Sequence, residues 1–321
     1  MDLIHEGKVK RIYQDPKSTD NVIIEFTDIV MGGDRKRQEE IEGKGNLACR
    51  MTEYLLGYLE GKGIDTHFLK ALDGPRLLCR KVNVFPIGIV CRNIAAGSFC
   101  TRYGVEEGTV LESPIIEFFL KDDKLNNPLI IENAITSLGL VKNEILQFMQ
   151  SVTHSTNYYL TALLKQQGLT LVDFKLEFGY TKDGHIVLAD ELSGDTMRIW
   201  DTSSDSRDRD VFGKEKGGIF EVYSKLIEVI TQTKPEEVNV RKEMVQVLVN
   251  PKDGIRNPPG EVTKRALVRL GFGEAEDVRV GKVFNIFLRK PITSEVLNHL
   301  KIMNIKLLSN PISEKQEVNF K

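Results

Sequence analysis

The stretch LVDFKLEFGYTKDGHIVLADE, residues 171–191, decides the fold class and contains the residues with the clearest chemistry. Its first half alternates apolar with charged residues, which is the pattern of a strand with two different faces. Asp183 and Gly184 form a strong hairpin signal, and HIVLADE is a returning strand. The stretch therefore predicts a β-hairpin with one apolar face and one charged face.

The charged face of this hairpin contains Asp173, Lys175 and Glu177. A two-residue turn pairs Glu177 with Asp190, and a shift of the register by two residues keeps Asp190 on the same face. Two opposed carboxylates destabilise a strand pair by ~0.2–1 kcal/mol, so the arrangement favours a bound cation. Oxygen ligands without histidine or cysteine are typical of magnesium, so we expect Glu177 and Asp190 to hold Mg²⁺.

An ordinary solvated strand face explains the same hairpin residues equally well, because Lys175 can neutralise the carboxylates beside it. Near the amino terminus, GKVKRIY places Gly7 before a strand and puts Lys8 and Lys10 on one strand face. Such a pair suits nucleotide phosphates, although a solvated strand edge gives the same pattern. The hairpin and this motif together favour a site for a phosphorylated nucleotide.

Two further segments are candidate anion sites. CRNIAAGS offers the guanidinium of Arg92, small residues that permit close backbone approach, and the hydroxyl of Ser98. Arg198, in MRIWD, follows the acidic hairpin. The alternatives are a strand end followed by a tight turn for CRNIAAGS, and a routine surface arginine for Arg198.

The whole chain has the size and composition of a cytoplasmic protein with one large or two ordinary domains. It has 321 residues, and its 44 basic residues nearly balance its 46 acidic ones, which argues against general binding of nucleic acid or membranes. The start lacks the apolar core of a secretory signal, and no stretch resembles a membrane span. Its four cysteines lack C-x-x-C spacing, so neither a zinc site nor a disulfide framework is indicated.

Strand and helix patterns mix along the chain without regular βαβ alternation, which predicts an α+β fold. The polar, proline-containing stretch 231–243 marks a domain boundary, so we predict domains at 1–235 and 240–321, the second a small α+β domain. The expected elements of the first domain are strands within 9–14, 22–26, 77–82 and 87–92 and helices within 46–59 and 145–163.

Seven motifs in this order resemble the phosphoribosylaminoimidazole-succinocarboxamide synthase (SAICAR synthetase) family: GKVKRIY, EGKGN, CRNIAAGS, PIIEFFLKDD, LVDFKLEFG, LADE and RIWD. The resemblance covers roughly residues 1–230. It implies a two-lobed ATP-binding fold and ligation of L-aspartate to the carboxylate of carboxyaminoimidazole ribonucleotide in purine biosynthesis. ATP and Mg²⁺ would be required, and ADP and phosphate would be released.

The resemblance also implies roles for individual residues. Lys8 and Lys10 would contact the ATP phosphates, and Glu177 and Asp190 would bind ATP through magnesium. The substrate phosphate would be bound by Arg92, Ser98 and Arg198. The residues expected to act in catalysis are Lys175, Asp190 and Arg198, with Asp173, Lys121 and Asp122 as further candidate contacts.

Two segments depart from the family pattern. The loop DIVMGGDR, residues 28–35, lacks the usual threonine, alanine and asparagine-glycine, and Gly213 stands where arginine is common. The resemblance therefore does not assign substrate contacts near these two segments.

Residues 244–321 resemble a different family, the small subunit of phosphoribosylformylglycinamidine synthase, through VLVNPKDGIRNPPG, RALVRLGF, VRVGKVF and KLLSNPISE. That subunit is non-catalytic, so the resemblance implies a fused assembly domain. Its partners would be the large and glutaminase subunits of that synthase, and a homo-oligomer is expected.

Three functions therefore compete: a ligase with an assembly domain, a catalytically impaired nucleotide-binding scaffold for the synthase complex, and a ligase of the same fold with another carboxylate substrate. The first is favoured because Lys8, Lys10, Glu177 and Asp190 are all present. ATP turnover measured with and without the ribotide and aspartate discriminates among them.

Overall fold

The structure is a computed structural model that describes residues 1–7, 9–31, 38–201, 227, 243–288 and 293–320. The chain divides into two compact units, Met1–Val240 and Arg241–Lys321. The stretch that joins them lies outside the described residues, so the exact limits 1–235 and 240–321 stay predictions. None of the described helices is long and apolar enough to cross a membrane.

The first unit begins with an antiparallel five-stranded sheet in the order β1-β2-β3-β7-β6. The strands are β1 (Leu3–Glu6), β2 (Lys10–Gln14), β3 (Asn21–Phe26), β6 (Phe68–Leu72) and β7 (Arg76–Arg80). A two-stranded ribbon, β4 (Ile29–Met31) with β5 (Gln38–Glu40), follows β3. The expected amino-terminal hairpin is confirmed, with Lys10 opposite Phe26.

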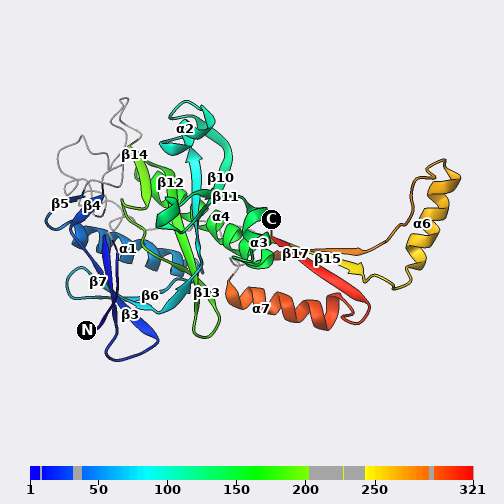
Figure 1. The fold of residues 1–321 in the computed structure, drawn as a ribbon, viewed down its shortest axis with the longest axis horizontal. Helices are drawn as coiled ribbons and strands as arrows, with labels where there is room; N and C mark the ends of the chain where they lie inside the picture. The colour runs from blue at the N-terminus through cyan, green and yellow to red at the C-terminus, as the bar shows by residue number, and fades with distance from the viewer. Residues whose placement is uncertain (8, 32–37, 202–226, 228–242, 289–292, 321) are drawn as a thin grey trace. The chain divides into compact units, whose positions relative to one another are not determined.

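Helix α1 (Lys44–Gly61) packs against this sheet and covers one face of it (Figure 1). Its buried apolar residues recur every four positions at Leu47, Met51, Leu55 and Leu59, as the sequence predicted. At its start the backbone of Gly45 lies so close to β3 that an added Cβ would stand 2.7 Å from the Phe26 carbonyl oxygen. Glycine is therefore required for the helix to approach the strand.

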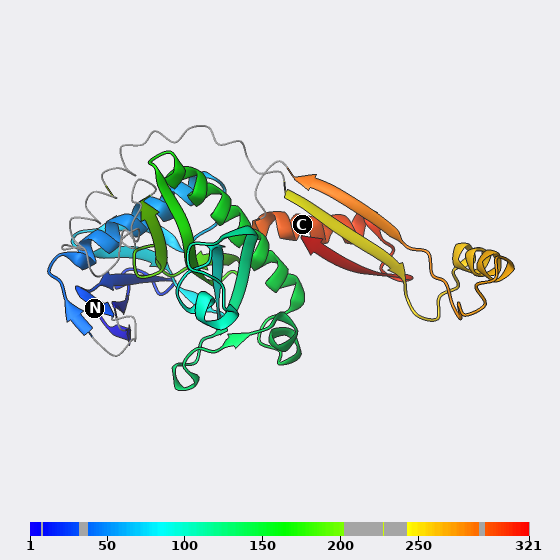
Figure 2. The same cartoon turned by 90° about the horizontal axis from the view of Figure 1, so that it is seen from above.

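The second sheet of this unit has the order β11-β10-β9-β12-β13, and β14 and β8 also pair with β12. Helix α4 packs against β12 and β9 (Figure 2). The strands are β8 (Val82–Val84), β9 (Ile87–Ile94), β10 (Val110–Leu120), β11 (Leu129–Ile130), β12 (Leu169–Thr181), β13 (Ile186–Ala189) and β14 (Met197–Asp201). The helices are α2 (Ser98–Tyr103), α3 (Glu132–Ser137) and α4 (Asn143–Lys165).

The decisive hairpin forms between β12 and β13, but its register differs from the predicted one. Glu177 lies opposite Ala189, not Asp190. The turn contains three residues, Lys182 to Gly184, because Thr181 N–H donates to the His185 carbonyl and Gly184 takes the left-handed φ of +79°. One extra turn residue shifts the pairing by one and reverses the parity, so the prediction that Asp190 shares the Glu177 face by strand alternation is wrong.

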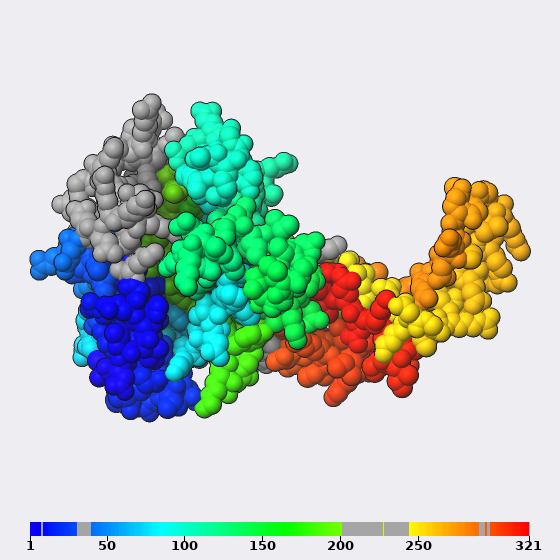
Figure 3. Space-filling view, in the orientation of Figure 1, coloured from blue at the N-terminus to red at the C-terminus, as the bar shows by residue number. Residues whose placement is uncertain are grey.

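The second unit is a three-stranded antiparallel sheet in the order β16-β15-β17 with helix α7 against it. Its core joins Val245, Val247 and Val249 of β15 with Leu297 and Leu300 of α7. Helix α6 begins after Asn257, whose side chain accepts from Gly260 N–H, and little of α6 is covered on the face shown in Figure 3. The elements are β15 (Glu243–Pro251), α6 (Pro258–Arg269), β16 (Lys282–Leu288), α7 (Ser294–Met303) and β17 (Glu314–Phe320). Both units mix helices and strands, which confirms the α+β class.

Candidate functional site

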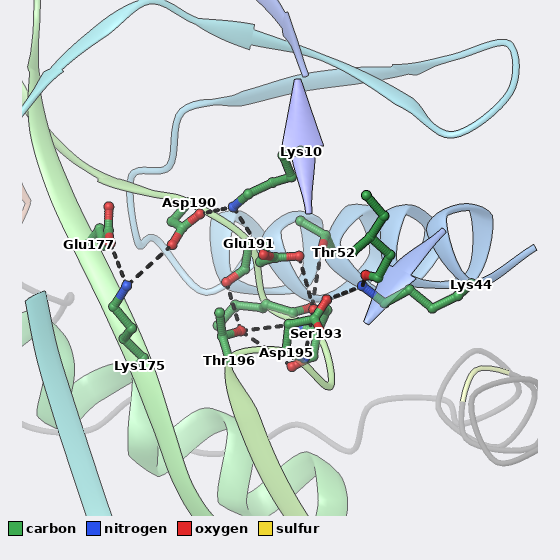
Figure 4. Close-up of polar contacts among 12 residues, drawn as sticks. Lys10, Lys44, Thr52, Lys175, Glu177, Asp190, Glu191, Ser193, Asp195 and Thr196 are labelled. Carbon is green, nitrogen blue, oxygen red and sulfur yellow. Dashed lines mark hydrogen bonds and ion pairs between the residues drawn. The ribbon is translucent and has the colours of Figure 1, made fainter. Parts of the chain in front are cut away.

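Charged side chains gather where β2 of the first sheet meets the segment that follows β13 (Figure 4). The Lys10 ammonium forms an ion pair with Asp190 Oδ1 and lies 3.0 Å from Glu191 Oε1. These side chains are mostly removed from solvent, with exposed fractions of 19% for Lys10, 16% for Asp190 and 4% for Glu191. A partly buried lysine is thus held between the carboxylates of two consecutive residues, Asp190 and Glu191.

Asp190 reaches this position through its backbone and not through strand alternation. Strand β13 ends at Ala189, and Asp190 takes a φ of +70°, in the left-handed region that aspartate tolerates better than most residues. The ring of the buried His67 lies near the Asp190 backbone. Burial lowers the pKa of His67 to about 4, so the ring is neutral at pH 7.

Two further lysines lie on the other side of Asp190. Lys175 Nζ is 2.6 Å from Glu177 Oε1 and 4.0 Å from Asp190 Oδ2, and Lys121 forms an ion pair with Glu177 Oε2. The structure therefore brings Lys10, Lys175, Glu177 and Asp190 together, although the route to Asp190 is not the predicted one.

The charges shift one another's pKa values in the expected directions. Burial opposes the charged form of Lys10, but Asp190 and Glu191 outweigh it and raise the Lys10 pKa. Burial likewise opposes ionised Asp190, yet Lys10 and Lys175 lower its pKa. For Glu191 burial prevails and the pKa is raised. Asp190, which faces both lysines, is thus ionised at neutral pH.

The carboxylates around Lys175 suit a hard cation for which the protein supplies only one or two ligands. Among the described residues no group of three or more histidine, cysteine, aspartate or glutamate side chains is placed to hold a metal ion. Glu177 and Asp190 offer only carboxylate oxygens, and Lys175 already places a positive charge between them. Magnesium commonly binds through one or two carboxylates together with phosphates and water, so these residues fit it.

A second charged cluster lies farther along β12. The buried Arg92 donates from Nε to Glu117 at 2.6 Å and from Nη1 to Asp173 at 2.8 Å. Arg198 Nη1 donates to the same Asp173 oxygen at 3.2 Å, and Arg102 donates to Glu117 at 2.5 Å. Arg198 and Arg102 keep exposed fractions of 30% and 29%, while Arg92 keeps 6%. The two partly exposed arginines therefore present the accessible positive charge.

Ser98 and its neighbour Gly97 complete this cluster. Ser98 is the first residue of α2, and its hydroxyl accepts from Arg102 Nη1 at 3.1 Å. A Cβ on Gly97 would stand 2.9 Å from Arg198 Nη2, so the glycine leaves room for the guanidinium. The structure thus brings Arg92, Ser98 and Arg198 into one neighbourhood, as predicted.

Strand β12 links the two clusters, because Asp173 belongs to the arginine cluster and Glu177 to the lysine cluster. Four residues of strand place these two Cα atoms about 13 Å apart, at roughly 3.3 Å per residue. The two charged clusters are therefore separate neighbourhoods along one strand.

The remaining predicted residues lie outside these two charged clusters or outside the described residues. Asp122 Oδ1 accepts from Lys124 N–H and Leu125 N–H and so caps the short helical turn Asp123–Leu125. Lys8 and Gly213 lie outside the described residues, as does the second half of the divergent loop 28–35.

Sequence reasoning missed the roles of five residues: Lys44, Arg102, Glu117, Glu191 and Asp195. Lys44 and Glu191 stand inside the motifs EGKGN and LADE, so proximity to a motif was the available signal. The Lys44–Asp195 ion pair joins residues 151 positions apart, which no local pattern indicates.

Comparison with known proteins gives two family matches. Residues 3–230 match the family described as SAICAR synthetase, and residues 244–321 match the family described as phosphoribosylformylglycinamidine (FGAM) synthase. The phosphoribosylaminoimidazole-succinocarboxamide synthase of Lactococcus lactis subsp. cremoris (strain SK11) is 40% identical over 233 residues, which is 72% of this chain and 98% of that protein. The synthase of the same name from Staphylococcus saprophyticus is 41% identical over 224 residues, or 70% of this chain and 96% of that protein.

Solved structures give the same result for the first unit. The phosphoribosylaminoimidazole-succinocarboxamide synthase of Ehrlichia chaffeensis matches with a TM-score of 0.67 and 34% identity, covering 72% of this chain and 99% of that one. A SAICAR synthetase (Type-2) in complex with ADP matches with a TM-score of 0.66 and 37% identity, covering 72% and 99%.

Proposed function

This chain belongs to the SAICAR synthetase family through residues 3–230, and on that premise we propose that its first unit uses ATP and Mg²⁺ to join L-aspartate to carboxyaminoimidazole ribonucleotide. The observation that carries the proposal is the convergence of Lys10, Lys175, Glu177 and Asp190. A related SAICAR synthetase was solved with ADP, which supports a nucleotide at this site.

The lysines and carboxylates divide the work of binding ATP. Lys10 and Lys175 supply positive charge to the phosphates. The family resemblance gives Lys8, two positions earlier in the sequence, the same role. Lys121 lies on the far side of Glu177 and adds a third described cation. Because burial removes water from Lys10, its charge acts on a phosphate at reduced screening.

Glu177 and Asp190 are the residues that would hold magnesium. When bound, the ion would neutralise phosphate oxygens and so favour phosphoryl transfer. Lys10 and Lys175 contact these carboxylates, so we expect each lysine to exchange a carboxylate partner for a phosphate when the nucleotide binds with the ion. Asp190 is central to this exchange because it contacts both lysines.

The arginine cluster is proposed to bind the phosphate of the ribotide. Its accessible groups are the guanidinium groups of Arg198 and Arg102 and the hydroxyl of Ser98. The buried Arg92 is held by Glu117 and Asp173 and orients Asp173 for Arg198. The spacing along β12 supports an arrangement in which the carboxylate of the ribotide lies near Lys175 and the transferable phosphate of ATP.

The proposed reaction has two balanced steps. A carboxylate oxygen of the ribotide attacks the γ-phosphorus, the bond from that phosphorus to the β–γ bridging oxygen breaks, and ADP leaves with the bond electrons. The aspartate amine then attacks the acyl carbon, phosphate leaves, and the amine proton passes to solvent. No covalent enzyme intermediate is needed, so positioning and charge neutralisation carry the catalysis. Absence of positional isotope exchange within ATP under every substrate combination would overturn this route.

The test of the proposed function is an ATP-turnover assay on the full chain, with the ribotide, aspartate or Mg²⁺ omitted in turn. We expect ADP release to require all three. Release that depends on neither the ribotide nor aspartate would overturn the ligase proposal and favour the scaffold alternative. Turnover with aspartate and a different carboxylate, but not with this ribotide, would instead support the third candidate.

A second proposal concerns the FGAM synthase-like unit at 244–321. We propose that it is an assembly domain that binds the large or glutaminase subunit of that synthase. The observation that favours this role is a self-contained core around β15 without a cluster of potential metal-binding side chains among its described residues.

A further inference from the structure

Glu191 is a buried carboxylate that the reaction above does not use. Its side chain is 4% exposed. Oε1 lies 3.0 Å from Lys10 Nζ, and Oε2 accepts from Ser193 Oγ at 3.0 Å. Among the described residues, Lys10 is the one site lysine that forms an ion pair with Glu191 (Figure 4).

The position of Glu191 matters because the Lys10 ammonium contacts two carboxylates, those of Asp190 and Glu191. The Lys10 ammonium contacts Asp190 and Glu191 together, while Asp190 is also the proposed ligand for the cation that accompanies ATP. An ammonium held by Asp190 alone would compete with that cation. A second carboxylate can retain the ammonium while Asp190 turns to the cation.

The segment that carries Glu191 is fastened to α1 at two points. Thr52 Oγ1 donates to the Leu192 carbonyl at 3.2 Å, and the Lys44 ammonium forms an ion pair with Asp195. Lys44 also donates to the Ile29 carbonyl at 3.2 Å, and its side chain is 2% exposed. The segment is thus held rigidly against the helix.

Hydrogen bonds within the segment transmit this constraint to Glu191. Asp195 N–H donates to Ser193 Oγ at 3.2 Å, and that hydroxyl donates to Glu191 Oε2. Thr196 Oγ1 donates to the Glu191 carbonyl at 3.1 Å. Both the side chain and the backbone of Glu191 are therefore fixed.

We propose that Glu191 is a positioning residue that retains Lys10 when Asp190 engages the cation of the bound nucleotide. Ser193 and the Lys44–Asp195 pair hold Glu191 for this purpose. The proposal rests on the proposed nucleotide site and adds to it a carboxylate that contacts neither the magnesium ion nor the phosphates.

The test compares the dissociation constants of Mg·ADP and of ADP with a chelator, measured by calorimetry on the full chain and on E191Q. Without Glu191, Lys10 pairs more tightly with Asp190, so Mg·ADP should bind about tenfold more weakly, equivalent to about 1.4 kcal/mol. Metal-free ADP should bind unchanged or more tightly, because a negative charge near Lys10 has been removed. S193A should change the two dissociation constants in the same directions as E191Q does, but by a smaller factor.

E60Q is the matched control, since Glu60 is a carboxylate that contacts Thr66 outside this network, and it should leave both constants unchanged. General damage to the site would weaken the binding of Mg·ADP and of metal-free ADP by the same factor, and that result would overturn the proposal. Unchanged dissociation constants in E191Q and S193A would overturn it as well. If E191Q does not fold, S193A alone decides by the same signs. If the wild-type chain binds no Mg·ADP, the proposed function itself is overturned. If the wild type binds Mg·ADP and both variants bind it equally well, only the role of Glu191 is overturned.

Discussion

Asp190 combines a left-handed backbone with contacts to two lysines, and these features depend on each other. A residue with β-region angles after Ala189 would continue β13 and direct its side chain according to strand parity. The φ of +70° instead redirects the carboxylate to Lys10 and Lys175. Aspartate and asparagine tolerate this region at little cost, so the residue type serves both the backbone and the charge.

Substitution D190N should separate these two roles. Asparagine keeps the size of the side chain and tolerates the left-handed backbone, so we expect the fold to persist. Loss of the charge should reduce Mg²⁺-dependent ATP turnover on the order of 10²-fold or more, as loss of a preorganised electrostatic group does. Circular dichroism checks the fold and steady-state kinetics the rate, and wild-type turnover in D190N would refute the metal assignment.

His67 should make stability depend on pH in a defined window. Its folded pKa of about 4 lies below the ordinary value of 6.5, so the unfolded chain binds the proton more readily. Its contribution is present above pH 6.5 and decreases as the pH falls toward 4, by about 3 kcal/mol in total. H67Q lacks this titration, so its free energy of unfolding should fall less steeply than that of the wild type between those values. Parallel curves for the two proteins would contradict the prediction.

At the scale of elements, α1 fixes the segment after β13 as well as packing on the first sheet. Its apolar stripe faces β3 and its first residue, Lys44, is buried against Asp195. A buried ion pair adds little stability over apolar residues, but removing one partner leaves an uncompensated charge. The Lys44–Asp195 pair therefore fixes the position of the segment after β13 more than it raises the free energy of unfolding of the first unit.

Substitution K44M should destabilise the first unit by about 1–3 kcal/mol, because the partly buried carboxylate of Asp195 loses the ammonium that pairs with it. The double variant K44M with D195L should recover most of this loss. Trp200 is the single tryptophan of the chain and is buried in the core of this unit beside Ile94 and Val172, so its fluorescence follows the denaturant unfolding of this unit. A single variant as stable as the wild type would show that the pair is not buried in solution.

At the scale of the whole molecule, the chain joins two units that each have their own core. The first contains both charged clusters, and the second contains a separate sheet with α7 against it. Compact units with separate cores commonly keep their properties when separated. The family matches follow the same division, with a ligase family in one unit and a synthase family in the other.

A chain ended after residue 240 should therefore keep ATP turnover but lose capture of the large synthase subunit. The full chain, used as bait, should retain that subunit in a pull-down. The D190N full chain is the control, because it should lose turnover and still capture the partner. Capture by the shortened chain, or none by the full chain at high micromolar concentration, would contradict the assembly role.

Local patterns determined much of this protein. Period-two and period-four repeats of apolar residues located β12, α1 and α4, and they placed Lys175 and Glu177 on one strand face. These features depend on neighbours within a few residues, so they can be read from the chain alone. The motifs also indicated the ligase family and the second domain, and both were confirmed.

The tertiary structure alone decided how Asp190 enters the site and what surrounds it. One additional turn residue reversed the parity of the hairpin, and a left-handed angle then redirected the carboxylate. Lys10 lies 180 positions from Asp190, and Lys44 lies 151 from Asp195. Such contacts arise when helices and sheets pack together, so the sequence by itself supplied the charges but not the partners that they acquire in the folded chain.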